Sequence, residues 1–155
     1  MNVCFFDHKG VVHFEFIAQG KTVNHQCYLE VLTRLWESVR RKGPGLWPGK
    51  LILHPDSAPA HDVLRVHKFL AKNSITKMDH PPYSPDLALC DFWLFPKLIN
   101  ALKGQRFACC SDIQRNVKML VRGIPENNFQ ECFWQWHHCF TKCIVSQGEY
   151  CDISR

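Results

Sequence analysis

Hydrophobic and polar positions along the chain change period several times, and each period predicts a different element. Residues 2–6 and 11–16 are runs of β-branched and aromatic side chains, and the Asp and Gly between them suit a tight turn. They predict a β-hairpin. From Thr22 onward apolar residues recur every three or four positions, which indicates an amphipathic helix. That helix is expected to end in the basic run 40–42, where positive charge suits the helix dipole.

The rest of the chain alternates short apolar runs with helical spacing. Runs at 50–54 and 74–78 predict two buried strands, with a helix between them within 61–72. The proline- and glycine-rich segment 43–49 is expected to be a loop. Periodicity predicts three further helices at about 91–103, 111–122 and 126–145. An opening hairpin followed by alternating strands and helices predicts one α/β domain with a mixed sheet.

Composition narrows the class of protein without fixing a function. The chain has 155 residues, 46% of them hydrophobic and 21% charged, as in soluble globular domains. We expect no membrane span, because no run of about eighteen apolar residues occurs, and no secretory signal at the N-terminus. The nine cysteines are then expected to be reduced thiols. A net charge of +5 permits a polyanionic partner.

Three aspartates stand where elements begin or end. Asp56 follows the apolar run 50–54, at the strand end where open α/β sheets hold their sites. Asp86 and Asp91 lie in "HPPYSPDLALCDFWLFPKL", residues 80–98, where a proline-rich stretch leads into a helix. An aspartate near a helix start accepts bonds from backbone N–H groups. A carboxylate on a rigid frame also suits a divalent cation, so both interpretations stay open on these residues alone.

Longer motifs around these aspartates resemble a known family. "LILHPDSAPAH", the 80–98 stretch and "LKGQRF" are similar, in this order, to the mariner branch of the Tc1/mariner DNA transposases, also found in SET-domain–mariner fusion proteins. "IPENNFQECF" and "KCIVSQGEY" extend the resemblance over nearly the whole chain. Asp56 matches the family's second catalytic aspartate and Asp91 the third, with 34 residues between them. Asp86 matches a position that is not catalytic.

The resemblance implies an RNase H-like fold, a mixed sheet with flanking helices. It implies metal-dependent cleavage and joining of DNA strands, in which Asp56 and Asp91 are catalytic and hold Mg²⁺ or Mn²⁺. It further implies DNA as the partner, a possible homodimer, and a place in the nucleus. No membrane partner is expected.

The family also contains parts that residues 1–155 do not match. Its first catalytic aspartate lies on a strand upstream of the position matched by Met1. Two helix-turn-helix modules also lie upstream of that position. Asp7 matches a hairpin turn and is expected to be a turn residue. The chain is therefore expected to be a partial catalytic domain and an inactive remnant as it stands. The alternatives are a domesticated nucleic-acid-binding or interaction module, and a truncated gene model of an active transposase.

One cluster invites a zinc interpretation that the spacing does not favour. Cys132, Cys139 and Cys143 fall on one helical stripe, with His137 and His138 nearby. No CxxC pair anchors them as structural zinc sites usually require. We expect a core stripe of small apolar side chains instead.

Overall fold

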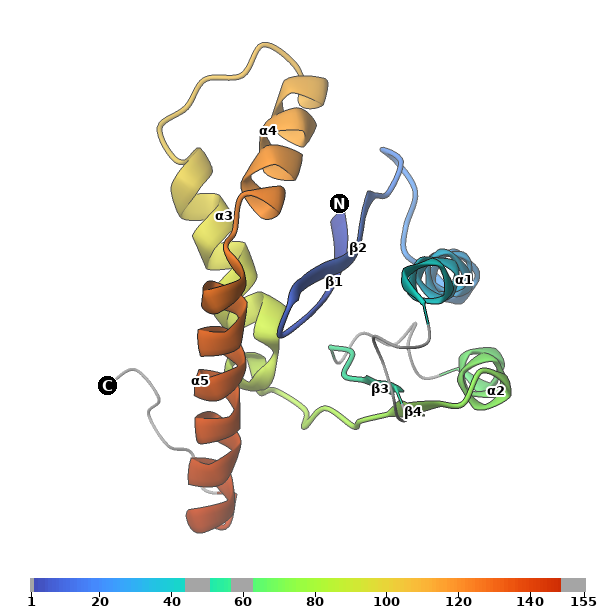
Figure 1. Ribbon diagram of the computed structural model, residues 1–155. Helices are drawn as coiled ribbons and strands as arrows, with labels where there is room; N and C mark the ends of the chain where they lie inside the picture. The colour runs from blue at the N-terminus through green and yellow to red at the C-terminus, as the bar shows by residue number, and fades with distance from the viewer. Residues whose placement is uncertain (1, 44–50, 57–62, 149–155) are drawn as a thin grey trace. The chain divides into compact units, whose positions relative to one another are not determined.

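The computed structural model describes residues 2–43, 51–56 and 63–148, so most of the loop predicted at 43–49 lies outside the described residues. The predicted strands and helices are confirmed to within a few residues, and with them the α/β class. In chain order they are β1 Asn2–Asp7, β2 Gly10–Phe16, α1 His25–Lys42, β3 Leu51–Leu53, α2 Leu64–Lys72, β4 Ile75–Lys77, α3 Phe95–Leu102, α4 Cys110–Arg122 and α5 Glu126–Val145 (Figure 1).

The chain divides into two compact units. One combines Met1–Phe5 with Val12–Ser84, and the other combines Phe6–Val11 with Pro85–Arg155. The tip of the β1–β2 hairpin therefore belongs to the second unit and its base to the first.

The hairpin turn is built by the carboxylate of Asp7. Its Oδ1 atom accepts the backbone N–H groups of Lys9, at 2.8 Å, and of Gly10, at 3.0 Å. Gly10 has a φ of 140°, a backbone conformation that glycine adopts without strain. Asp7 is therefore a turn residue, as the sequence predicts.

In the first unit two helices and a parallel strand pair share one core. Strand β3 pairs with β4, with Leu51 opposite Ile75, and helix α1 begins at His25 because the side chain of Asn24 accepts the N–H of Cys27. The helix thus starts three residues after Thr22, the position from which the sequence predicts helical spacing. The core combines α1, α2, β3 and β4: Tyr28, Leu32, Leu35, Val39, Leu53, Val66, Leu70 and Ile75.

A hairpin and a parallel strand pair are both present, but they form separate sheets. Among the described residues β1 and β2 form one two-stranded sheet, and β3 and β4 form another. The mixed pattern predicted from the sequence is thus divided between a hairpin and a parallel pair.

The second unit is helical. Helices α3 and α4 lie side by side as the two arms of a helical hairpin, and the long helix α5 follows (Figure 1). Phe6 at the hairpin tip packs against Phe129 of α5, with ring centroids 5.5 Å apart, and Trp93 lies 5.1 Å from the same Phe129 ring. The buried apolar residues of this unit are Leu87, Ala88, Leu94, Leu98, Val117, Val121, Phe129, Cys132 and Cys139.

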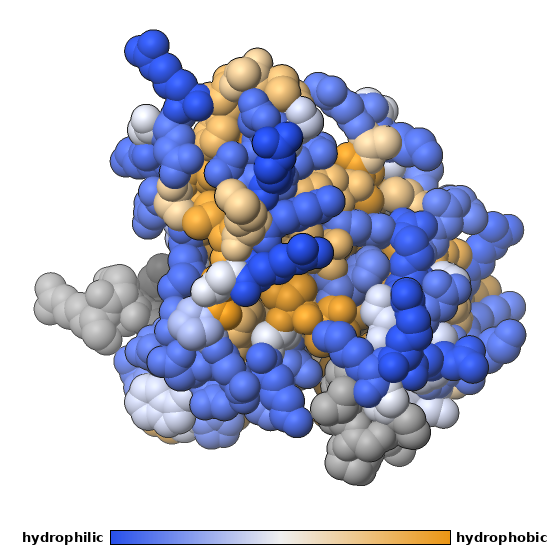
Figure 2. Space-filling model, turned by 45° about the horizontal axis from the view of Figure 1, so that its top comes forward, coloured by the Kyte–Doolittle hydropathy of each residue, from blue (hydrophilic) through white to orange (hydrophobic). Residues whose placement is uncertain are grey.

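Hydrophilic residues cover much of the face seen in Figure 2, with hydrophobic side chains between them. Within the described part of the chain no helix combines the length and the apolar character needed to cross a membrane. The eight cysteines in that part are free thiols.

Candidate metal centre

Asp56 lies beyond the carboxyl end of a short parallel strand pair. It follows the last residue of β3 by three positions, and its side chain is exposed. The pairing continues past the strands, because the N–H of Met78 donates to the carbonyl of Leu53 at 2.8 Å. Since β3 and β4 are parallel, the segments that follow them leave from the same edge of the pair. Open α/β sheets bind ligands at this edge.

Two histidines contact each other at that edge. Nδ1 of His80, after β4, lies 3.3 Å from Nε2 of His54, after β3, and the ring centroids are 5.2 Å apart. Burial lowers the pKa of His54 below its ordinary 6.5, and the neighbouring His80 lowers it further, while the charge of Asp56 opposes both effects. His54 is therefore a neutral imidazole near neutral pH.

The charge of Asp56 also affects the pKa of Tyr28 on α1. Burial is the main cause that raises the pKa of this phenol, and the Asp56 carboxylate raises it further. Tyr28 thus stays protonated, so Asp56 is the negative charge beside a neutral phenol and a neutral imidazole. Such a group suits a cation better than an anion.

Asp91 lies in a widened helical turn. Residues Cys90–Leu94 form a π-helical turn that leads into α3, and the N–H of Phe95 donates to the carbonyl of Cys90. Pro96 follows, and it has no N–H to donate to the carbonyl four residues earlier. Insertions of this kind are rare and occur often at functional sites. The backbone N–H of Asp91 donates to Ala88 at 2.9 Å, and its side chain is exposed.

Asp86 has a different position within the same motif. It lies in the 3₁₀ turn Pro85–Leu87 and is half-buried. Its charge raises the pKa of the Cys139 thiol on α5, after the larger effect of burial. The adjacent Leu87 carbonyl accepts the indole N–H of Trp136 at 2.9 Å. Asp86 therefore lies where the motif packs on α5.

The cysteine stripe on α5 is confirmed as packing for its two inner members. Cys132 and Cys139 are buried, Cys143 is half-buried, and His137 and His138 are exposed. Burial raises the pKa of the Cys132 thiol to about 12, so in the absence of a metal it is protonated near neutral pH. Across the residues that the structure describes, no three His, Cys, Asp or Glu side chains gather closely enough to hold an ion.

Asp56 belongs to the first unit and Asp91 to the second. Their convergence on one metal ion stays a prediction of the sequence. Sequence reasoning also missed His54 and Tyr28 as neighbours of Asp56, and His80 as a neighbour of His54. The two histidines carry a signal, since His54 ends the predicted strand segment 50–54 and His80 lies two residues after the predicted segment 74–78, whereas nothing in the sequence relates Tyr28 to Asp56.

Comparisons with known proteins agree with the motifs. Residues 1–48 match the family model described as transposase (partial DDE domain). The Mariner Mos1 transposase of Drosophila mauritiana is 31% identical over 155 residues, which cover 96% of this chain and 44% of that protein. The human histone-lysine N-methyltransferase SETMAR is 26% identical over 145 residues, which cover 92% of this chain and 21% of that protein. The chain spans less than half the length of both relatives.

Solved structures of the Mos1 transposase also match this chain in fold. The catalytic domain of Mos1 mariner transposase matches with a TM-score of 0.89 at 27% identity, over 97% of this chain and 75% of that one. The same domain with Raltegravir and Mg matches equally well, over 76% of that chain. The Mos1 paired-end complex with the left transposon end matches with a TM-score of 0.86 at 27% identity, over 96% of this chain and 44% of that one.

Proposed function

We propose that this chain contributes to a metal-dependent site for cutting and joining DNA strands, because it resembles mariner-type DDE transposases in sequence and has their RNase H-like fold. Asp56 and Asp91 are the residues that hold the metal. The observation that carries the proposal is the placement of Asp91, an exposed carboxylate in a π-helical turn inside the family's motif. Asp56 supports it as an exposed carboxylate beyond a parallel strand pair.

The donor atoms suit Mg²⁺ or Mn²⁺. Both ions take carboxylate oxygens, and both side chains are exposed, so water can complete the coordination shell. The neutral His54 and Tyr28 beside Asp56 add no positive charge that would repel a cation. When bound, such ions stabilise the attacking and leaving oxygens of an in-line displacement at phosphorus. Related structures of the Mos1 catalytic domain contain Raltegravir with Mg or with Mn.

Residues 1–155 by themselves supply two of the three aspartates that the family resemblance assigns to the reaction. The 155-residue chain alone is therefore expected to bind an ion weakly and to leave DNA uncut. A two-ion displacement requires both ions to be fixed, and a displacement of a reacting group by an ångström costs on the order of a hundredfold in rate.

DNA is the partner that this function requires. Solved structures of Mos1 include a paired-end complex with a transposon end and a pre-cleavage transpososome. By analogy we assign to this chain duplex DNA as substrate, a pairing of two copies on two DNA ends, and a place in the nucleus.

Titration of the purified chain with Mn²⁺ tests the metal assignment. Asp56→Asn and Asp91→Asn should each weaken Mn²⁺ binding at least tenfold, because each removes a charged oxygen ligand. Asp86→Asn is the matched control, since it removes a carboxylate from the same motif five residues away, and it should leave the affinity unchanged. Unchanged affinity in Asp91→Asn, or an equal loss in Asp86→Asn, would contradict the proposal.

A further inference from the structure

The positive charge of the chain is concentrated in one stretch. Residues 92–125 contain six basic residues and one acidic residue, a net charge of +5. The whole chain has 19 basic and 14 acidic residues, also a net of +5. The other 121 residues therefore carry 13 of each sign, and their charges cancel.

This stretch forms the helical hairpin of α3 and α4, which lies within the second unit. We name its basic side chains the hairpin cations. All of them are exposed: Lys97 on α3, Lys103 and Arg106 in the connection, and Arg115, Lys118 and Arg122 on α4.

The three cations of α4 form one stripe. Arg115, Lys118 and Arg122 are spaced i, i+3 and i+7, which places them on one side of the helix. Val117 and Val121, which point elsewhere on the helix, are buried. From Arg115 to Arg122 the helix rises about 10 Å, which matches about three phosphates along one strand of a duplex.

The contacts of Arg115 and Lys97 leave the charge of these two side chains available to an external partner. Asp112 is the single acidic residue of the stretch, and its carboxylate lies 3.7 Å from Arg115, whose side chain is 71% exposed. An exposed pair of this kind contributes little, at most about 1 kcal/mol, and is screened by salt. The ammonium group of Lys97 lies 5.6 Å from the Trp93 ring centroid, which orients it without cancelling its charge.

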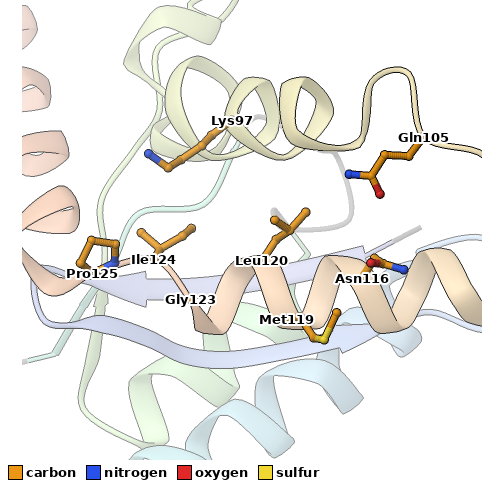
Figure 3. A pocket seen from close by; sticks show the side chains of 8 residues that line it. All are labelled: Lys97, Gln105, Asn116, Met119, Leu120, Gly123, Ile124 and Pro125. Atoms are coloured by element: carbon orange, nitrogen blue, oxygen red, sulfur yellow. The ribbon is translucent and has the colours of Figure 1, made fainter.

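A groove of about 370 Å³ runs between the two arms (Figure 3). Its lining is mainly apolar, and Figure 3 shows Lys97 on one arm opposite Leu120 and Ile124 on the other. The cations of the α4 stripe do not line it. Lys97 is therefore the one hairpin cation among the groove's lining residues, and the other five lie outside it.

We propose that the α3–α4 hairpin binds the phosphate backbone of duplex DNA through the hairpin cations. This inference rests on the proposed function and adds an anchoring surface distinct from the two aspartates. Charge complementarity selects the partner, because a line of exposed cations at helical spacing matches a line of phosphates. A membrane surface is the competing partner, because Ile99, Ile113 and Met119 of the hairpin are exposed apolar residues. The regular spacing of the cations favours the duplex.

The test compares two triple variants of the full chain that change charge equally. Arg115→Gln, Lys118→Gln and Arg122→Gln together remove the α4 stripe. Arg65→Gln, Lys68→Gln and Lys72→Gln are the matched control, because these residues are also three exposed cations spaced i, i+3 and i+7, on α2, with one Arg and two Lys in place of two Arg and one Lys. Circular dichroism and thermal unfolding verify that both variants fold.

Fluorescence anisotropy with a labelled DNA duplex, in EDTA and at several NaCl concentrations, measures affinity and its salt dependence. The α4 variant should bind at least tenfold more weakly, and the slope of log affinity against log salt should fall in magnitude by about 2.7, which is 0.9 for each of three phosphates. The α2 variant should bind within about threefold of the wild type.

Equal losses in the two triple variants would overturn the inference, because binding would then follow total charge and not this surface. A loss of binding to phosphatidylserine vesicles with duplex binding intact would also overturn it. EDTA separates this test from the metal assignment. Asp56→Asn and Asp91→Asn should keep the wild-type slope of log duplex affinity against log salt. If these two variants lose Mn²⁺ binding while the α4 variant binds duplex normally, the metal assignment stands and this inference fails.

Discussion

The indole Nε1 of Trp136 donates a hydrogen bond of 2.9 Å to the backbone carbonyl of Leu87. This bond connects the middle of α5 to the 3₁₀ turn that precedes Asp91 by four residues. The turn also has a backbone bond from the N–H of Ala88 to the carbonyl of Pro85, at 3.0 Å, and the indole adds a bond from α5 that helps to hold the approach to α3. The position of the candidate ligand Asp91 therefore depends on α5, a helix some fifty residues later in the chain.

Replacement of Trp136 by Phe should weaken both the fold and the metal site. The change leaves the Leu87 carbonyl without its donor, which costs about 1–3 kcal/mol in the free energy of unfolding. Mn²⁺ affinity should fall with it, because Asp91 is held less firmly. Trp134→Phe is the control on the same helix, since that indole is 69% exposed and should change neither quantity. Chemical denaturation and Mn²⁺ titration give both results, and an equal effect of the two variants would disprove the role of the bond.

Phe129 should be the most sensitive core position of the second unit. It is 2% exposed and contacts the rings of both Phe6 and Trp93. Phe129→Ala should lower the free energy of unfolding by about 3–5 kcal/mol, the usual cost of the lost contacts and the cavity. Ile144→Ala, on the same helix but 75% exposed, should cost less than about 0.5 kcal/mol. A small effect of Phe129→Ala would show that the aromatic cluster is not the core of this unit.

In the first unit Arg34 of α1 donates two hydrogen bonds to the carboxylate of Glu15 on β2. Its Nε lies 2.8 Å from Oε2 of Glu15, and its Nη2 lies 2.9 Å from Oε1. Arg34→Lys retains the charge and loses the planar fork, so it should cost about 0.5–1 kcal/mol. Arg41→Lys, in the exposed last turn of the same helix, should be neutral. Thermal unfolding at low and high salt measures both, and neutrality of Arg34→Lys would contradict the prediction.

Cys132 should resist thiol reagents in the folded protein. Burial, with a smaller contribution from Cys90, raises its pKa from 9.0 to about 12, so the reactive thiolate is scarce. The raised pKa also makes the free energy of unfolding depend on pH. The contribution of this thiol is fully present below pH 9.0, and it is lost as the pH rises from 9.0 toward about 12. The exposed Cys110 is the internal control. Maleimide labelling with peptide mass spectrometry should modify Cys110 first, and equal rates for the two thiols would refute the buried position.

Local patterns predicted the elements of this fold because their causes are local. Pro125 and Glu126 mark the start of α5, and its apolar spacing continues to Val145, as observed. The hairpin turn follows from the short side chain of Asp7 and from Gly10, which lie within three residues of each other. Capping and turn formation depend on near neighbours, so the sequence displays them directly.

Features that join distant residues were not predictable in the same way. The π-helical turn at Asp91 could be recognised as a helix but not as a widened one, because the effect of Pro96 depends on how the preceding turn packs. The contact between His54 and His80 requires β3 and β4 to pair in one register, which short apolar runs do not specify. The proposed sharing of one ion by Asp56 and Asp91 would be a long-range relationship of the same kind, and it stays a prediction.

The central claim is that Asp56 and Asp91 bind one divalent cation. Crystals of the chain grown with Mn²⁺ test it directly, because anomalous scattering locates the ion independently of the protein atoms. We expect one strong peak with a carboxylate oxygen of each aspartate about 2.0–2.2 Å away. A peak bound elsewhere, or carboxylates of Asp56 and Asp91 too far apart to share an ion, would contradict it.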